Sequence, residues 1–301
     1  MVAANKKATS MLQRRRNIAG YLFIAPAIIG FLVFCLVPMF YSLYISFTEW
    51  NMVSEPVSVG WGNYETMFSD ELVWQALKVT LYYTVLGVPL CNIVALGMAL
   101  LLNNKVKGLS LFRTIFYIPS IVPAVAASAL WMFIFNPFNG LLNTLVSYLG
   151  LPKQQWIYSA SQVIPCMAAM AAWGSGSTAV IYLAGLQGIP AHLYESIDMD
   201  GGNWWHKFAH ITLPLLSPVV FYNVVMGVIG SMQAFTQGYI MTKGGPNNAS
   251  MFYVLLLYNR AFLYSKMGEA CAMAWVLFVI IGVLTAINFY ASKHWVYYEG
   301  A

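Results

Sequence analysis

Residues 270–292 read ACAMAWVLFVIIGVLTAINFYAS and contain no charged side chain. A bilayer core about 30 Å thick is crossed by about 20 mostly apolar residues of helix. The apolar residues surround the whole circumference and do not alternate with polar ones, which argues against a strand of a membrane barrel. The segment therefore predicts a transmembrane helix.

Five more stretches of the chain pass the same test. They are Ile18–Phe47, Trp74–Leu102, Phe112–Phe135, Val163–Leu186 and Pro214–Ile240. Prolines within these spans predict kinks or short unwound turns, which a bilayer tolerates only against protein neighbours; they are Pro26, Pro38, Pro89, Pro119 and Pro123. The predicted fold class is an all-α, polytopic membrane protein with six transmembrane helices.

The composition of the whole chain supports this class. Of its 301 residues, 60% are hydrophobic and 8% are charged, against about 45–50% and about 25% in soluble domains. This excludes a soluble enzyme, a disordered chain and a secreted disulfide scaffold. The net charge of +5 is too small and too scattered for a nucleic-acid partner. The four cysteines lie in apolar runs without a CxxC pattern and are interpreted as core residues.

The distribution of basic residues predicts the orientation. Five Lys and Arg residues precede the first span, whereas the loop 48–73 has none and carries five acids. Lys105, Lys107 and Arg113 follow in the next loop. Because positive loops stay in the cytoplasm, both ends are predicted on the cytoplasmic side of the membrane. We divide the chain into a cytoplasmic segment 1–17, a six-span transmembrane domain 18–292 and a cytoplasmic tail 293–301.

The fourth loop, residues 187–213, is cytoplasmic in this topology and contains a short amphipathic helix. Pro190 is expected to open the helix, and Gly201 or Gly202 to close it. Leu193, Tyr194 and Ile197 share one face, which needs a partner; the acids Glu195 and Asp198 lie opposite. Acidic residues suit protein docking better than docking on an anionic leaflet. A second amphipathic stretch, Trp204–Leu215, is expected to end at Pro214 and Pro218.

The loop closely resembles a signature of ABC importer permeases, the "EAA" loop. The matching residues are Ala184-Gly-Leu-Gln-Gly-Ile-Pro190, Leu193-Tyr-Glu195, Asp198, Asp200-Gly201, Phe208 and Leu213-Pro214. Similar matches occur along nearly the whole chain, including Arg113-Thr-Ile-Phe-Tyr-Ile-Pro119 and Gly244-Gly-Pro246. They resemble the carbohydrate-uptake branch, with its maltose-type and glycerol-phosphate-type permeases. The resemblance implies a type I ABC importer permease that translocates sugars or oligosaccharides by alternating access.

The resemblance also implies partners and a coupling site. The residues of the implied coupling helix that would dock on a cytoplasmic ATPase are Tyr194, Glu195, Asp198, Asp200, Gly201 and Gly202. The expected assembly adds a second, different permease chain, two ATPase copies and an extracytoplasmic sugar-binding protein. The chain has no G-x-x-x-x-G-K-[ST] phosphate loop. ATP and Mg are therefore expected on the ATPase, and no cofactor on this chain.

Two departures from the family pattern leave a question open. The family's two alanines after the glutamate are Ser196 and Ile197 here, and its alanine after Gly201 is Gly202. The larger Ile197 is expected to change how the loop seats on its partner. The first external loop is also too short for the large domain of enterobacterial maltose permease, so contact with a binding protein must rest on other loops.

The candidate solute path lies in the fifth span. If this span is one continuous helix, one of its faces carries Asn223, Gly227, Gly230 and Gln237, and Gln233 lies beside that face. Each residue has a structural alternative, namely helix packing or hydrogen bonding within the fold. Weaker candidates for solute contact are Asn92, Asn288, Tyr82, Tyr83 and Trp173. The spans contain no evident Arg or Lys, so a neutral sugar is favoured over a sugar phosphate.

Two other classes of protein remain as alternatives. An ion-coupled secondary sugar transporter needs ionisable groups within the spans, and none is evident there. A membrane-bound assembly protein would use the fourth loop as a scaffold. No enzyme active site is predicted. His206 and His210 are spaced for metal ligation but lack the glutamate of a zinc peptidase, so no metal site is predicted either.

Overall fold

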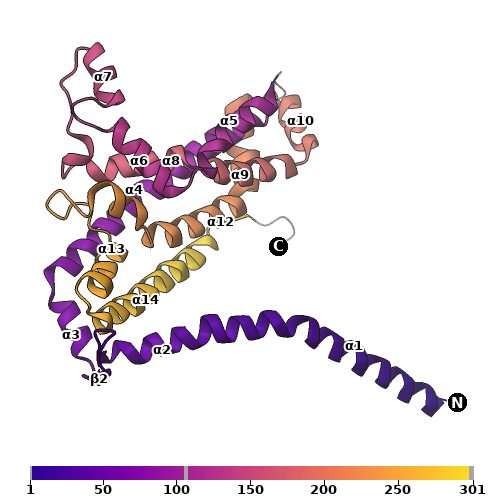
Figure 1. Ribbon diagram of the computed structural model, residues 1–301. Coiled ribbons are helices and arrows are strands. Elements are labelled where there is room, and N and C mark those ends of the chain that lie inside the picture. Colours follow the sequence, from indigo (N-terminus) through magenta and orange to yellow (C-terminus); the bar gives the residue numbers. More distant parts are fainter. Residues whose placement is uncertain (1, 105–107, 298–301) are drawn as a thin grey trace.

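The computed structural model describes residues 2–104 and 108–297, and these form an almost entirely helical chain (Figure 1). Two short strands, β1 (Thr48–Glu49) and β2 (Val57–Ser58), pair antiparallel in the first loop. The all-α class is therefore confirmed. Lys105, Lys107 and the last four residues of the predicted tail lie outside the described residues.

Four of the six predicted spans are helices long and apolar enough to cross a membrane. They are Arg16–Ser46, Glu71–Leu102, Trp204–Met232 and Met267–Ser292. The first combines α1 (Val2–Phe31), the π-helical turn η1 (Leu32–Leu36) and α2 (Val37–Ser46). The second and last are α4 and α14. α4 is the central helix, because α8, α9 and α12 all pack against it.

The other two predicted spans are bent pairs of helices. An interruption was predicted in the first of them from Pro119 and Pro123, but none was predicted in the second. α5 (Leu109–Ile121) and α6 (Ala124–Ile134) meet at 99°, and α8 (Val163–Trp173) and α9 (Gly176–Gly188) meet at 51°. The first bend follows from Pro123, because a residue before proline avoids helical geometry and Val122 is extended, with φ −64° and ψ 127°. If each pair is counted as one span, the total is six.

The second bend brings the start of α9 against the backbone of α5. A Cβ atom at Gly176 would lie 2.3 Å from the carbonyl oxygen of Phe116. Only glycine permits this approach, so the Gly174–Ser175–Gly176 segment bends where no proline is present.

Pro214 does not end the helix that precedes it, and neither does Pro218, contrary to the prediction. α11 (Trp204–Lys207), the π-helical turn η3 (Phe208–Thr212) and α12 (Leu213–Met232) follow one another without a break. A proline inside a helix lacks an N–H and collides with the preceding turn. A widened π turn lies immediately before Pro214, as η1 does before Pro38, and such a turn accommodates the misfit.

The fifth span is shorter than predicted, because its helix ends at Met232 and not at Ile240. Gln233, Ala234 and Phe235 are not helical, and the chain resumes helical turns at Thr236 and in η4 (Gly238–Thr242). Met232 and Ala234 are buried in the same core cluster as Phe252. Burial of these side chains outweighs continuation of the helix.

Several short helices in the loops were not predicted. They are α3 (Gly62–Ser69), α7 (Leu141–Tyr148), η2 (Trp156–Tyr158), α13 (Tyr253–Tyr258) and η5 (Asn259–Leu263). Arg260 of η5 forms ion pairs with Asp70, which caps α4, and with Glu269 in the first turn of α14. These pairs fasten three elements at one end of the molecule.

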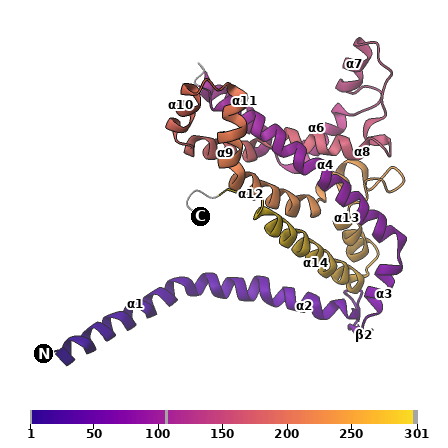
Figure 2. The same cartoon turned by 180° about the vertical axis from the view of Figure 1, so that it is seen from behind.

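The elements are sorted between two ends of the molecule. The starts of α1 and α10 (Ala191–Met199) and the end of α14 lie towards one end, whereas β1, β2, α3 and α13 lie at the other (Figure 1). The first span stands apart from the other helices over most of its length in both views (Figures 1 and 2). The most apolar 18 residues of this span include no buried residue. The contact with the rest of the described chain is made mainly by α2, which packs on α14 and accepts a 3.2 Å hydrogen bond at Ser42 Oγ from Trp275 Nε1.

We predict that Gly176→Ala destabilises the fold, because its Cβ would collide with the α5 backbone. Over-packing of this kind costs about 1–3 kcal/mol, so the thermal unfolding midpoint of the purified protein should fall by several degrees. Gly282→Ala on α14 is the matched control, since no heavy atom lies within 4 Å of its Cβ position. Equal midpoints for the two variants would contradict the close approach.

Candidate functional site

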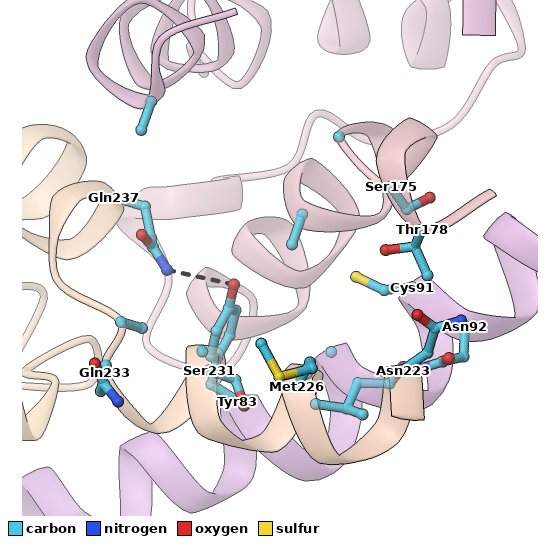
Figure 3. A pocket seen from close by; sticks show the side chains of 18 of the residues that line it. Tyr83, Cys91, Asn92, Ser175, Thr178, Asn223, Met226, Ser231, Gln233 and Gln237 are labelled. Atoms are coloured by element: carbon cyan, nitrogen blue, oxygen red, sulfur yellow. Dashed lines mark hydrogen bonds between the residues drawn. The ribbon is translucent and has the colours of Figure 1, made fainter. Parts of the chain in front are cut away.

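A cavity of about 600 Å³ lies between α4, α9 and α12 (Figure 3). Among the residues that the structure describes, its wall includes hydroxyl, amide and aromatic side chains but no charged residue. The polar and aromatic members are Tyr83, Asn92, Ser175, Thr178, Tyr222, Asn223, Ser231, Gln233, Phe235, Thr236 and Gln237. Such a wall suits a solute that offers hydroxyl groups and apolar ring faces and carries no charge.

All three helix breaks in the spans meet at this cavity. Ala124 begins α6 after the first break, Gly174 and Ser175 form the second, and Gln233 to Phe235 form the third; all line the wall. Non-helical backbone at membrane depth is tolerated only where it is buried in protein or lines a cavity. Broken helices also form the solute sites of many transporters.

The structure brings all five predicted solute-path residues to this cavity, although not on one continuous helix. Asn223, Gly227 and Gly230 lie on α12, Gln233 lies in the break and Gln237 lies beyond it. The two glycines differ. A Cβ at Gly227 would lie 3.1 Å from Val88 Cγ1, so this glycine serves packing against α4, whereas no heavy atom lies within 4 Å of a Cβ at Gly230. Their contact with solute stays a prediction.

Hydrogen bonds fix two of the four amide side chains of the wall, those of Gln237 and Asn92. Gln237 Nε2 donates to the Tyr83 hydroxyl at 3.3 Å (Figure 3). Asn92 donates to the Val88 carbonyl and accepts a 2.6 Å bond from Tyr182. Asn223 is 6% exposed, and its Nδ2 has no hydrogen-bond partner among the described residues. An unpaired buried amide costs about 1–3 kcal/mol, so Asn223 is the amide of the wall that most needs a hydrogen-bond partner.

The weaker candidates divide between the cavity and the rest of the fold. Tyr83 and Asn92 line the cavity, but Tyr82, Trp173 and Asn288 do not. Asn288 bonds to the Leu284 carbonyl of its own helix, which is the structural alternative stated for it. Ser175, Thr178 and Ser231 were missed. The Gly174–Ser175–Gly176 triplet inside an apolar span was the available signal for a break at this point.

The second candidate site is the fourth loop, where α10 begins after Pro190 as predicted. Gly201 has a φ of +72°, so it is the glycine that closes the helix. Gly202 does not have a positive φ and differs from Gly201 in this respect. Asp200 is the C-terminal cap residue of α10.

The apolar face of α10 is partly covered within the chain, and docking of this face on another protein stays a prediction. The Tyr194 hydroxyl lies 3.1 Å from Thr212 Oγ1 of η3, and Asp198 forms a 2.6 Å ion pair with Lys207 of α11. The side chains on this face, those of Leu193, Tyr194 and Ile197, are half-buried where α10 packs against α11 and η3. Glu195 and Met199 are exposed, and Glu195 forms no ion pair with any described residue. The exposed side of α10 is therefore its acidic side.

The part of the chain described by the structure holds no cluster of three or more His, Cys, Asp or Glu residues that fits a metal ion. The rings of His206 and His210 stack at 6.1 Å. His206 instead forms a capping box with Asn203 at the start of α11.

A comparison of the sequence with known protein families identifies the family of this chain. Residues 91–294 match the family described as the binding-protein-dependent transport system inner membrane component. The chain belongs to this family. It is an integral membrane permease subunit, a different class of protein from an ion-coupled secondary transporter or an assembly scaffold.

Curated relatives match over nearly their whole length. The probable ABC transporter permease protein YesP of Bacillus subtilis is 42% identical over 98% of this chain and 96% of its own. The lactose transport system permease protein of Rhizobium radiobacter is 32% identical over 94% and 97% of the two chains. The arabinooligosaccharides transport system permease protein of B. subtilis is 33% identical over 95% and 92%.

Solved structures confirm the permease fold. A chain of a bacterial alginate ABC transporter, in complex with an alginate pentasaccharide-bound periplasmic protein, aligns with a TM-score of 0.80 at 22% identity over 93% of this chain and 95% of that chain. Another alginate importer structure gives a TM-score of 0.77 at 22% identity, covering 94% and 98% of the two chains.

Thiol labelling tests the geometry of the cavity in this permease. Cys91 lines the cavity, and Cys166 is buried elsewhere. With Cys35 and Cys271 replaced by serine, we expect Gly230→Trp to slow alkylation of Cys91 several-fold, because the indole would occupy the same space. Gly97→Trp on α4, outside the wall, should leave the rate unchanged. Equal slowing by both variants would contradict the cavity.

Proposed function

We propose that this permease translocates a neutral sugar or oligosaccharide through the cavity between α4, α9 and α12. The observation that carries the proposal is the wall itself, which combines hydroxyl, amide and aromatic groups without one charged residue. A sugar offers hydroxyl groups to the hydroxyl and amide side chains, and apolar ring faces to the aromatic side chains. A phosphorylated or acidic solute would lose its hydration there without an opposite charge in exchange.

The relatives support a saccharide as the solute. Lactose and arabinooligosaccharides are named for two permeases more than 30% identical to this one. One of the two alginate transporters imports an acidic polysaccharide, but at 22% identity both share only the fold with this chain. The uncharged wall therefore favours the neutral class over the acidic one.

The energy is proposed to come from ATP hydrolysed, with Mg, on two copies of a separate ATPase subunit. The chain lacks the phosphate-binding string that an ATPase would need. The exposed acidic side of α10 supports docking on a protein with basic or backbone donor groups, with Glu195 as the central contact. Closure of the two ATPase subunits would then move α10, and the permease would alternate between inward-open and outward-open forms.

A second permease subunit is proposed to cover the first span. That span is strongly apolar, and over most of its length it stands apart from the other helices of the chain (Figures 1 and 2). In lipid, helices associate through packing contacts with other helices. The expected partner is a different permease chain, which makes the transmembrane unit a heterodimer.

The proposed topology has six spans in the bacterial inner membrane, with both termini and α10 in the cytoplasm. The starts of α1 and α10 and the end of α14 lie towards one end of the molecule, which supports this topology (Figure 1). The opposite end, with the hairpin β1–β2, α3 and α13, would then face the outside and receive solute from an extracytoplasmic binding protein. The boundaries 1–17, 18–292 and 293–301 belong to this proposal.

ATP hydrolysis by the reconstituted complex tests the function. We expect one or a few neutral saccharides, delivered by their binding protein, to stimulate hydrolysis, and phosphorylated or uronic-acid sugars to leave it at the basal rate. Uptake should survive a protonophore while ATP is supplied. Stimulation by charged sugars alone would contradict the solute class, and uptake that fails with the protonophore would contradict the energy source.

Charge reversal at Glu195 tests the docking site. Because Glu195 is exposed and pairs with no described residue, Glu195→Arg should leave folding unchanged but reduce ATP-driven uptake and retention of the ATPase. The acid Glu65 of α3 is exposed at the opposite end, so Glu65→Arg is the matched control for ATPase retention. Undiminished retention with Glu195→Arg would contradict docking through this side of α10.

A further inference from the structure

The C-terminal end of α10 is closed by two backbone hydrogen bonds. The Gly201 N–H donates to the Asp198 carbonyl at 3.1 Å, and the Gly202 N–H donates to the Ile197 carbonyl at 2.9 Å. With Gly201 at a φ of +72°, this is the Schellman arrangement, in which an apolar contact commonly joins the third-last helical residue to the second residue after the cap. Those two positions are Ile197 and Gly202.

At this contact Ile197 supplies all the side-chain atoms, and Gly202 supplies none. A Cβ atom on Gly202 would lie 2.3 Å from Ile197 Cγ2 and 3.1 Å from the Ile197 carbonyl oxygen. Ile197 is β-branched and stiff at χ1, so its Cγ2 cannot move aside without leaving its preferred rotamer. His206 Cβ, 3.4 Å from the same point, closes the space from the side of α11. Gly202 is therefore required by lack of space, whereas Gly201 is required by its backbone conformation.

We propose that Ile197 and Gly202 are a matched pair of positioning residues that sets the angle between α10 and the α11–α12 helix. This inference rests on the proposed docking of α10 on an ATPase. It answers the question left by the sequence, because the bulk added at position 197 is accommodated by the side chain absent at position 202. The pair keeps the loop's shape and does not alter its docking side.

The angle matters because α10 is joined to the cavity through one continuous helix. The Ile197–Gly202 contact, the Tyr194–Thr212 bond and the Asp198–Lys207 pair hold α10 against α11 and η3. The same helix runs on to Met232 and carries Asn223, Gly227 and Gly230 of the cavity wall. A displacement of α10 is thereby passed to the wall as the motion of one body.

The test uses the full complex in vesicles and measures saccharide uptake per ATP hydrolysed, together with retention of the ATPase subunit. Gly202→Ala should lower uptake about tenfold while the complex still assembles, as expected for over-packing at a close contact. Adding Ile197→Ala, which removes Cγ2, should restore uptake to within about threefold of the original protein. Adding Ile197→Val, which keeps Cγ2, should not restore it.

The outcomes separate this inference from the proposed function. Rescue by Ile197→Ala and not by Ile197→Val, with the ATPase retained, supports the pair, whereas a folding defect at position 202 would lower ATPase retention in parallel with uptake. Full uptake with Gly202→Ala alone, or equal rescue by both second changes, overturns it. If Gly202→Ala prevents assembly, the two double variants still decide by the same comparison. An original complex that hydrolyses ATP without transporting any saccharide would instead overturn the proposed function.

Discussion

Within a bilayer no water is available to pair a backbone N–H or C=O group, and this constraint shapes the whole molecule. It makes the chain helical over its apolar stretches and restricts every interruption to a protein-lined interior. The three interruptions, at Val122–Pro123, Gly174–Ser175 and Gln233–Phe235, all reach one cavity. The non-helical backbone, which lipid would not tolerate, is therefore concentrated at the cavity, where its polar groups can face a solute.

The second feature on which function depends is the continuity of the helix from Trp204 to Met232. Two prolines would ordinarily interrupt it, but the π turn η3 before Pro214 lets the helix continue. One end of this helix packs against α10, and the other end forms a wall of the cavity. The proposed coupling between ATPase and solute path therefore runs through one continuous helix, against which α10 packs at one end and which lines the cavity at the other.

Sequence patterns predicted what depends on composition and local chemistry. The length of the apolar stretches predicted the first, second and last spans within about three residues at each end. Pro190 predicted the start of α10, and the pair Gly201 and Gly202 predicted its end. Features that depend on tertiary contacts were beyond these patterns. The bend at Gly176 follows from the distant carbonyl of Phe116, and the end of α12 follows from burial with Phe252. The prediction assumed one continuous helix, and all five residues that it named still line the cavity. This is because the chain turns at Gln233 and continues around the same space.

The central claim is that the cavity formed by the three helix breaks is the path of the solute, and protection of Cys91 tests it most directly. The thiol lines the cavity and contributes no hydrogen bond to its wall. In the complete complex supplied with ATP and a loaded binding protein, the transported saccharide should slow alkylation of Cys91, whereas a saccharide that does not stimulate ATP hydrolysis should have no effect. An alkylation rate that is the same with and without the transported saccharide would contradict the claim.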